Sequence, residues 1–314
     1  MDITWFTTSK RNTEKRNISD LLTYLREKRN FNETSYLEEK CKKINSFFSN
    51  SKLDAAVVGI SGGIDSAVTI ALLKAASNEK DSPIKNILGV IAPIHGDGTS
   101  NQDSAENKAK RFMIMSGIKF VITDLSSAYK ELINSGDTDK IFSPWANGQM
   151  ASILRTPMFY YQAALQQTLG YKSIVVGTTN RDEGSYIGFF GKASDAAVDL
   201  QPIADLHKSE VYKIAKLLNV SQEIIDATPA GDVYDSKVDE EMIGAPYDFL
   251  ELYLLMKEYS IHPSEYLIES DFNTYKHFAN NIEILHSKNS HKYKVGNPAH
   301  FIDIMSRKIP GGWN

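Results

Sequence analysis

Short apolar segments alternate with amphipathic helical patterns along the middle of the chain. Four apolar segments indicate buried strands, at 55–60 (AAVVGI), 86–93 (NILGVIAP), 119–123 (KFVIT) and 173–177 (SIVVG). The helical patterns between them cover 65–76, 102–116 and 149–169. Strands separated by helices in this way form βαβ units, which build a parallel sheet covered on both faces. The sequence therefore predicts an α/β fold with a doubly wound parallel sheet.

The segments on either side of this alternation predict further helices. Residues 36–50 carry apolar side chains at helical spacing, and 246–260 and 272–287 indicate C-terminal helices after the sheet. Residues 1–35 are polar and weakly patterned. We therefore expect a helical N-terminal arm over 1–35 and a single domain over 36–314.

The composition excludes several classes of protein. The chain has 314 residues, of which 42% are hydrophobic and 24% charged, as in an ordinary globular protein. Its net charge of −4 gives no basic excess, so no nucleic-acid partner is expected. No segment approaches the ~20 apolar residues of a membrane span, and the polar N-terminus lacks a signal-peptide pattern. The only cysteine, Cys41, permits no internal disulfide, so we expect a reducing, cytoplasmic compartment.

The loop GISGGIDS joins the first predicted strand to the first predicted helix. A glycine-rich turn into a helix N-terminus presents unpaired N–H groups and the positive end of the helix dipole, which suit a phosphate group. Adjacent glycines let the backbone approach a ligand closely. Asp65 would repel bare phosphate, so its presence indicates a bridging cation, and carboxylate chemistry favours Mg²⁺. The residues of this expected phosphate-binding loop are Gly59, Ile60, Ser61, Gly62, Gly63, Ile64, Asp65 and Ser66.

Two other phosphate-binding loops do not fit this stretch. The Walker pattern needs a lysine before the hydroxyl residue, whereas here Asp65 precedes Ser66. The dinucleotide pattern G-x-G-x-x-G is also absent. A tight turn with a serine cap would explain the pair of glycines, but it would not explain the whole six-residue pattern SGGIDS directly after a strand.

Residues 61–66, SGGIDS, resemble the SGGxDS loop of the ATP pyrophosphatases, which grips the pyrophosphate of ATP while an acceptor is adenylated. The stretch 177–218, which begins GTTNRDEG, resembles the matching segment of the ammonia-dependent NAD synthetases, and the resemblance extends over about 36–300. It implies an adenine nucleotide alpha hydrolase-like fold. It also implies an ATP-dependent amide ligase that converts deamido-NAD and ammonia to NAD through an acyl-adenylate, releasing AMP and pyrophosphate.

The resemblance assigns roles to residues along the chain. It implies that the ATP-binding residues are Gly59–Ser66, Thr178 and Lys208, that the Mg²⁺ ligands are Asp65 and Glu183, and that the catalytic residues are Asp65, Glu183 and Lys208. The residues implied to bind the acceptor are Arg155, Lys192, Asp199, His291 and Lys292. Without the resemblance, Glu183 would equally suit a helix cap, and His291–Lys292 a solvated tail.

The resemblance also implies a homodimer. The apolar stripe of 36–48 and the helix that carries Met158, Phe159, Tyr160 and Tyr161 are the surfaces that we expect to need a partner. A fused glutaminase domain would need at least another ~100 residues. The expected nitrogen source is therefore free ammonia or a separate glutaminase.

Several positions depart from the family pattern, and they lie on the acceptor side. Pro157 stands where a second arginine is usual, Ala230 where a threonine is usual, and Ser194-Asp195-Ala196 where Gly-Asp-Gly is usual. Two alternatives therefore stay open. The chain could amidate a different small carboxylate, or it could be a non-catalytic nucleotide-binding regulator. A nucleic-acid base as acceptor is disfavoured because basic patches are missing.

Overall fold

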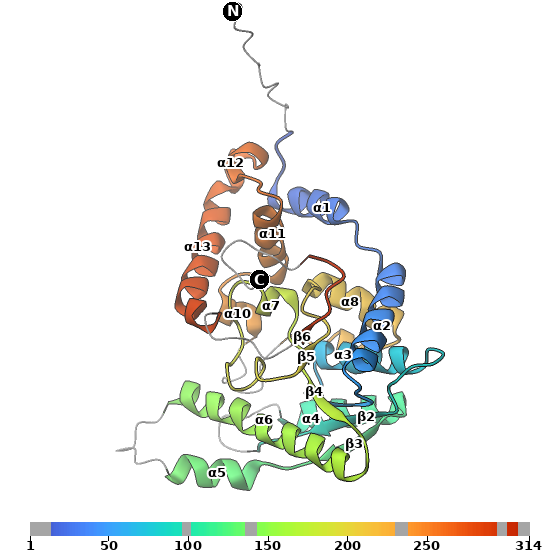
Figure 1. The fold of residues 1–314 in the computed structure, drawn as a ribbon. Helices are drawn as coiled ribbons and strands as arrows, with labels where there is room; N and C mark the ends of the chain where they lie inside the picture. The colour runs from blue at the N-terminus through green and yellow to red at the C-terminus, as the bar shows by residue number, and fades with distance from the viewer. Residues whose placement is uncertain (1–13, 96–101, 136–142, 230–237, 294–299, 307–314) are drawn as a thin grey trace, which may run out of the picture.

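The structure is a computed structural model that describes residues 14–95, 102–135, 143–229, 238–293 and 300–306 (Figure 1). Within these residues six parallel strands form one sheet in the order β3-β2-β1-β4-β5-β6. Their bounds are Ala55–Gly59 (β1), Asn86–Ile91 (β2), Lys119–Ile122 (β3), Ser173–Val176 (β4), Leu200–Gln201 (β5) and His300–Phe301 (β6). The predicted doubly wound parallel sheet is confirmed. Strands β5 and β6, with two residues each, were not predicted.

The strand order reverses between β1 and β4. From β1 the chain builds outward through β2 to β3, and from β4 it builds outward in the opposite direction through β5 to β6. Open α/β sheets bind their ligands in the crevice beside such a reversal, at the carboxyl ends of the strands. The loop 59–66 leaves β1 at this crevice.

Helices cover both faces of the sheet because side chains alternate along each strand. Ala56 and Val58 pack with α2 (Glu33–Asn50), α3 (Ile64–Ser77) and α8 (Lys208–Leu217), whereas Val57 packs on the opposite face with α6 (Pro144–Thr168) and Tyr129 of α5 (Ser126–Ser135). In Figure 1, α5 and α6 lie together at the bottom of the view. The helix α4 (Gln102–Ser116) buries Ala109, Phe112 and Met113 beside α3.

The predicted long helices are confirmed with small shifts at their ends. The helix α6 begins five residues before the predicted start at 149, because the Ser143 side chain caps its first turn and Pro144 takes the first helical position. The predicted C-terminal helices are α11 (Tyr247–Glu258) and α13 (Phe272–Asn289). The remaining short helices are α7 (Arg181–Gly184), α9 (Gln222–Ile225), α10 (Asp239–Ile243), α12 (Pro263–Tyr266), η1 (Glu269–Asp271) and η2 (Ser290–Lys292).

A second apolar cluster lies beyond the sheet, at the top of Figure 1. The helix α1 (Ile18–Arg29), within the segment expected to form an N-terminal arm, contributes the buried residues Leu21, Leu22 and Leu25. These leucines pack with α11, which is buried along most of its length. Within the described part of the chain, no helix combines the length and apolar character that a membrane crossing requires.

The apolar stripe of 36–48 is covered by the chain itself. Tyr36, Cys41, Ile44 and Phe48 are buried against the helices α3 and α8. The expectation that this stripe needs a partner subunit is therefore wrong, because helices of the same chain cover it. The single cysteine is a buried free thiol.

One buried ion pair ties α2 to the C-terminal strand region. Lys40 Nζ lies 2.9 Å from Asp205 Oδ1, and both side chains are fully buried. Asp205 also accepts hydrogen bonds from the Tyr36 hydroxyl at 2.8 Å and from Ile304 N at 2.8 Å. Although burial opposes ionisation, the Lys40 charge and these hydrogen bonds hold the pKa of Asp205 below its usual value. The pair therefore fixes the segment after β6 against the core.

We expect Lys40→Met to destabilise the fold by about 3–5 kcal/mol, because it leaves the Asp205 carboxylate buried without its countercharge. Lys43→Met is the matched control on the same helix, since the exposed contact between Lys43 Nζ and Asp303 O should contribute less than about 1 kcal/mol. Urea unfolding of both variants at neutral pH measures the difference. Equal stabilities of the two variants would contradict the role given to this pair.

Candidate active site

The loop 59–66 is held in shape by its own side chains. Gly62 has a φ of +82°, and a Cβ there would come 2.4 Å from the carbonyl oxygen of Ala105 in α4, so only glycine fits. The Ser61 hydroxyl accepts from Gly63 N at 3.2 Å. The buried Ser66 hydroxyl donates to Gly63 O at 3.0 Å and lies 3.3 Å from Ser61 N. The loop is therefore preformed.

Beyond the loop, α3 begins at the end of β1, with Gly63 as its N-cap. The first N–H groups of a helix have no partner within the helix, and its dipole adds partial positive charge there. The first-turn N–H groups of Ile64, Asp65 and Ser66 thus form a site for an anion. The geometry agrees with the phosphate-binding role expected for the loop.

Three charged side chains meet at this helix N-terminus. Lys208 Nζ, from the first residue of α8, lies 2.6 Å from Asp65 Oδ2 and 3.2 Å from Glu183 Oε1 of α7. The Lys208 side chain is nearly buried, and the two carboxylates are about one-fifth exposed. The structure thus brings together all three residues expected to be catalytic.

Two neutral side chains hold the carboxylates in place. Asn180 Nδ2 donates to Asp65 Oδ1 at 3.0 Å and to Glu183 Oε1 at 2.7 Å. The Tyr247 hydroxyl, from α11, donates to Glu183 Oε1 at 2.9 Å. Burial and the nearby carboxylates raise the pKa of Tyr247, so its hydroxyl stays a donor. Each carboxylate therefore keeps a fixed orientation.

The buried carboxylate of Asp182 positions Lys208 through its backbone. Asp182 Oδ2 accepts from Lys208 N at 2.7 Å, and Asp182 Oδ1 lies 2.6 Å from Nδ1 of His207. Burial and the nearby Arg29 and Arg181 lower the pKa of His207 well below its ordinary value, so its neutral ring donates to Asp182. Asp182 and Glu183 are adjacent in α7. The start of α8 is thus joined directly to α7.

The charges of the site shift the pKa values of its groups. Burial raises the pKa of Glu183 to about 7, and Asp65 and Asp239 add to the effect while Lys208 opposes it. Burial acts against the charged form of Lys208, but Asp65 and Glu183 outweigh it and raise its pKa above the usual value. The lysine is therefore always charged, whereas Glu183 changes charge near neutral pH.

Asp65 and Glu183 fit a divalent cation. Both carboxylates are anchored by the same amide, Asn180, and face the same ammonium group, so their oxygens share one small volume. Hard carboxylate oxygens with room for water and phosphate ligands are the donor set that Mg²⁺ prefers. These two carboxylates would hold such an ion, which would supply positive charge beside Lys208.

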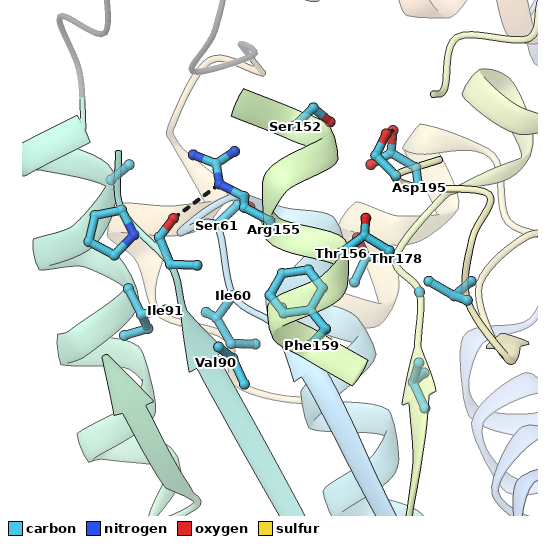
Figure 2. A pocket seen from close by; sticks show the side chains of 18 of the residues that line it. Ile60, Ser61, Val90, Ile91, Ser152, Arg155, Thr156, Phe159, Thr178 and Asp195 are labelled. Atoms are coloured by element: carbon cyan, nitrogen blue, oxygen red, sulfur yellow. Dashed lines mark hydrogen bonds between the residues drawn. The ribbon is translucent and has the colours of Figure 1, made fainter. Parts of the chain in front are cut away.

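A pocket opens between the loop and α6. Figure 2 shows Ile60 and Ser61 of the loop, Arg155, Thr156 and Phe159 of α6, and Thr178 after β4 around it. Arg155 Nε donates to the carbonyl oxygen of Ala92 at 3.0 Å. Apolar walls from Val90, Ile91, Phe159 and Val198 suit a flat ring. Thr178, which the resemblance assigns to ATP, and Arg155, which it assigns to the acceptor, therefore border the same pocket.

The other residues expected to bind the acceptor lie outside this pocket. Lys192 is exposed. Asp199 Oδ2 accepts from Val175 N at 2.8 Å, and its other oxygen lies 3.4 Å from the Tyr160 hydroxyl. His291 is exposed, whereas Lys292 Nζ donates to the carbonyl oxygens of Gly188 at 2.8 Å and Phe190 at 2.6 Å. Lys292 thus supports the segment that leads from Glu183 to Lys192.

The departures from the family pattern fall in different surroundings. Pro157 lies on the exposed side of α6, two residues from Arg155. Ser194 and Asp195 border the pocket, and Ala196 is buried behind them. Ala230 lies outside the described residues.

Sequence reasoning did not identify Asn180, Asp182 or Tyr247. Asn180 caps the four-residue helix α7, and an asparagine before two acidic residues is a capping signature that could have identified it. Tyr247 is 64 positions from Glu183 along the chain. No local pattern marks such a residue.

Comparisons with known proteins agree on one family. A family model described as NAD synthase matches residues 36–296. The NH₃-dependent NAD⁺ synthetase of Methanocaldococcus jannaschii is 31% identical over 261 residues, covering 82% of this chain and 91% of that protein. The solved NMN synthetase of Francisella tularensis superposes with a TM-score of 0.69 at 25% identity, covering 85% of this chain and 98% of that one. An NH₃-dependent NAD synthetase of Campylobacter jejuni, at 22% identity and a TM-score of 0.63, shares the fold.

We expect Glu183→Gln to stabilise the unliganded protein at alkaline pH. The pKa of Glu183 rises from 4.5 to about 7 on folding. Between these values the folded state binds more protons than the unfolded chain, so stability falls as the pH rises through that window. Removing this charge should therefore raise the free energy of unfolding at pH 8 by on the order of 1 kcal/mol or more, and should change it less at pH 5.

Denaturant unfolding at both pH values tests this expectation. The exposed Glu241 of the neighbouring helix α10 provides the matched control, and Glu241→Gln should show no such pH dependence. A Glu183→Gln variant that is less stable than the wild type at pH 8 would overturn the expectation.

Proposed function

The chain belongs to the NAD synthase family, and on this premise we propose how its residues carry out the ATP-dependent amidation of deamido-NAD to NAD. The protein is an ATP-dependent amide ligase that uses ammonia as the nitrogen donor. The observation that carries the residue assignment is the contact of Lys208 with Asp65 and Glu183 at the N-terminus of α3.

Adenylation is needed because a carboxylate does not react with ammonia in water near pH 7. A carboxylate oxygen of the acceptor attacks the α-phosphorus of ATP, and the bond to the pyrophosphate oxygen breaks. Charge accumulates on the departing pyrophosphate, and fixed donors and cations must stabilise it. The N–H groups of residues 62–66 and the Lys208 ammonium group would meet that charge. Phosphoryl-type transfer needs mainly positioning and charge of this kind.

Mg²⁺ held by Asp65 and Glu183 would neutralise charge on the phosphate oxygens. Asn180 and Tyr247 keep the two carboxylates turned toward the ion site. Asp182 keeps Lys208 at the start of α8. In the second step ammonia attacks the acyl carbon, AMP leaves, and the amide remains.

Arg155, Lys192, Asp199, His291 and Lys292 are proposed to contact the acceptor. The exposure of Lys192 and His291 supports this role, because both side chains are accessible to a ligand. The ammonia would come from solution or from a separate glutaminase. The cytoplasm is the proposed compartment, which suits the free thiol of Cys41.

A mononucleotide acceptor is the second candidate. One of the similar solved structures is named as an NMN synthetase. The same two steps would apply, with nicotinate mononucleotide in place of deamido-NAD. The departures at Pro157, Ser194 and Ala196 are compatible with this candidate, because they alter the proposed acceptor side and leave the ATP motif unchanged.

A direct assay decides between the two acceptors. The protein is incubated with ATP, Mg²⁺ and ammonium, together with either deamido-NAD or nicotinate mononucleotide, and AMP and amide are quantified. We expect AMP and NAD in equal amounts and a higher kcat/KM with deamido-NAD. A higher kcat/KM with the mononucleotide would establish the second candidate. If neither acid supports the formation of AMP, the proposed function is contradicted.

Asp65→Asn is the negative control for this assay. It keeps the shape of the side chain but removes a charge from the ion site, so kcat should fall by at least ~100-fold with an unchanged circular dichroism spectrum. Near-normal turnover would remove Asp65 from the mechanism.

A homodimer is proposed on the exposed face of α6. This helix leaves large apolar side chains in solvent along its length, namely Trp145, Ile153, Tyr160 and Tyr161. The adjacent helix α5 adds the exposed residue Leu132. A second copy of the chain would cover this face, which lies beside Asp199.

Analytical ultracentrifugation tests this interface. The wild-type protein should sediment with the mass of two chains at micromolar concentration. Tyr161→Glu should weaken association by at least ~10-fold, or about 1.4 kcal/mol, because it buries a charge in an apolar contact. The matched control is Ile284→Glu, which changes an exposed apolar residue of α13 and should leave the dimer intact. A monomeric wild type would rule out the proposal.

A further inference from the structure

We propose that Gln201 is a positioning residue that joins the ATP side of the pocket to its acceptor side. Gln201 does not line the pocket, but its amide hydrogen-bonds to Thr179 and Asp195, in the two backbone segments that form one wall of the pocket. The inference rests on the proposed function, because it assigns the two sides of this wall to the two substrates.

Gln201 lies at the end of the short strand β5 and is fully buried. Its Oε1 accepts from Thr179 N at 3.2 Å, directly after the expected ATP-binding residue Thr178. Its Nε2 donates to the carbonyl oxygen of Asp195 at 2.8 Å and lies 3.4 Å from the Thr179 hydroxyl oxygen. One amide group therefore bridges the chain after β4 and the turn 191–195.

The backbone after β4 is shaped to receive this amide. A Cβ at Gly177 would come 2.6 Å from Gln201 Oε1, so any other residue would push the amide away. Gly177 N in turn donates to Leu200 O at 2.8 Å, which holds the two strand ends together. Gly177 borders the pocket, and its lack of a side chain lets Gln201 support the pocket wall directly from behind.

The turn on the acceptor side is held by the same contact. Asp195 Oδ2 accepts from Gly191 N at 3.0 Å and from the Ser194 hydroxyl at 3.2 Å, so the side chain of Asp195 closes the turn. Its carbonyl group meets Gln201. Figure 2 shows Asp195 and Thr178 toward the same side of the pocket. The turn includes Ser194, which replaces a glycine of the family pattern, so Gln201 anchors an altered part of the site.

The chemistry of the amide explains why glutamine is needed at this position. An apolar residue would leave Thr179 N buried without a partner, at a cost of about 1–3 kcal/mol. A carboxylate would still accept from Thr179 N, but its second oxygen would face the Asp195 carbonyl oxygen, and two acceptors repel. Only a side chain with one acceptor and one donor at the same distance satisfies both segments.

Two substitutions of Gln201 therefore distinguish its contact with Thr179 from its contact with Asp195. Gln201→Glu should raise the KM for the acceptor by ~10-fold, equivalent to one lost hydrogen bond, and the KM for ATP by less than ~3-fold. Gln201→Met should raise both KM values by a similar factor. In Gln201→Glu the acceptor KM should recover as the pH falls, because a protonated carboxyl group regains a donor.

Steady-state kinetics of the whole enzyme, with each substrate varied in turn, measure these values. Ile44→Val, in the core between α2 and the sheet, is the control for general destabilisation and should change neither KM. If Gln201→Met does not fold, Gly177→Ala displaces the same amide and should raise both KM values. Gln201 variants that change Tm but leave both KM values at wild-type levels would overturn the inference while the proposed function stands. A wild type that amidates neither acid overturns both.

Discussion

Two negatively charged carboxylates are held beside one buried ammonium group, and contacts from several helices keep these three charges together. Asp65, Glu183 and Lys208 each sit in the first turn of a helix, in α3, α7 and α8. The parallel sheet brings these helices together, because the segments that follow neighbouring strands all begin at the carboxyl edge of the sheet. The amide of Asn180, the hydroxyl of Tyr247 and the carboxylate of Asp182 then fix each group separately. Like charges at such a distance repel, so without these contacts the side chains would turn apart.

The two halves of the site differ in how far they are organised before ligands bind. On the ATP side, the hydroxyls of Ser61 and Ser66 bond within the loop, and Gly62 packs against α4. Lys192 and His291, which are proposed to contact the acceptor, are exposed to solvent. This contrast fits an enzyme in which the loop that faces ATP is formed in advance and the fit to the acceptor is completed when the acceptor binds.

The sequence predicted the parts of the molecule that local chemistry determines. The strands β1 and β4 are buried on both faces, so they appear as continuous apolar runs, and the loop 59–66 is a contiguous motif. The strands β5 and β6 have two residues each and are too short for any periodicity. The resemblance identified Asp65, Glu183 and Lys208, which the structure brings together. It did not identify Tyr247, whose partner Glu183 lies 64 positions away, or Gln201, whose contacts depend on how the ends of β4 and β5 pack together.

The contacts that assemble the site also set the order in which it can form. Lys208 reaches Asp65 across 143 positions of sequence, and Arg29 reaches Glu210 across 181. Contacts of such long range form slowly, because a large loop must close before they contribute. During synthesis on the ribosome, the phosphate loop leaves the exit tunnel long before the lysine that balances its aspartate. A nascent chain therefore carries the recognisable motif without its lysine, and the cluster of Asp65, Glu183 and Lys208 can assemble only after about two-thirds of the 314 residues have been made.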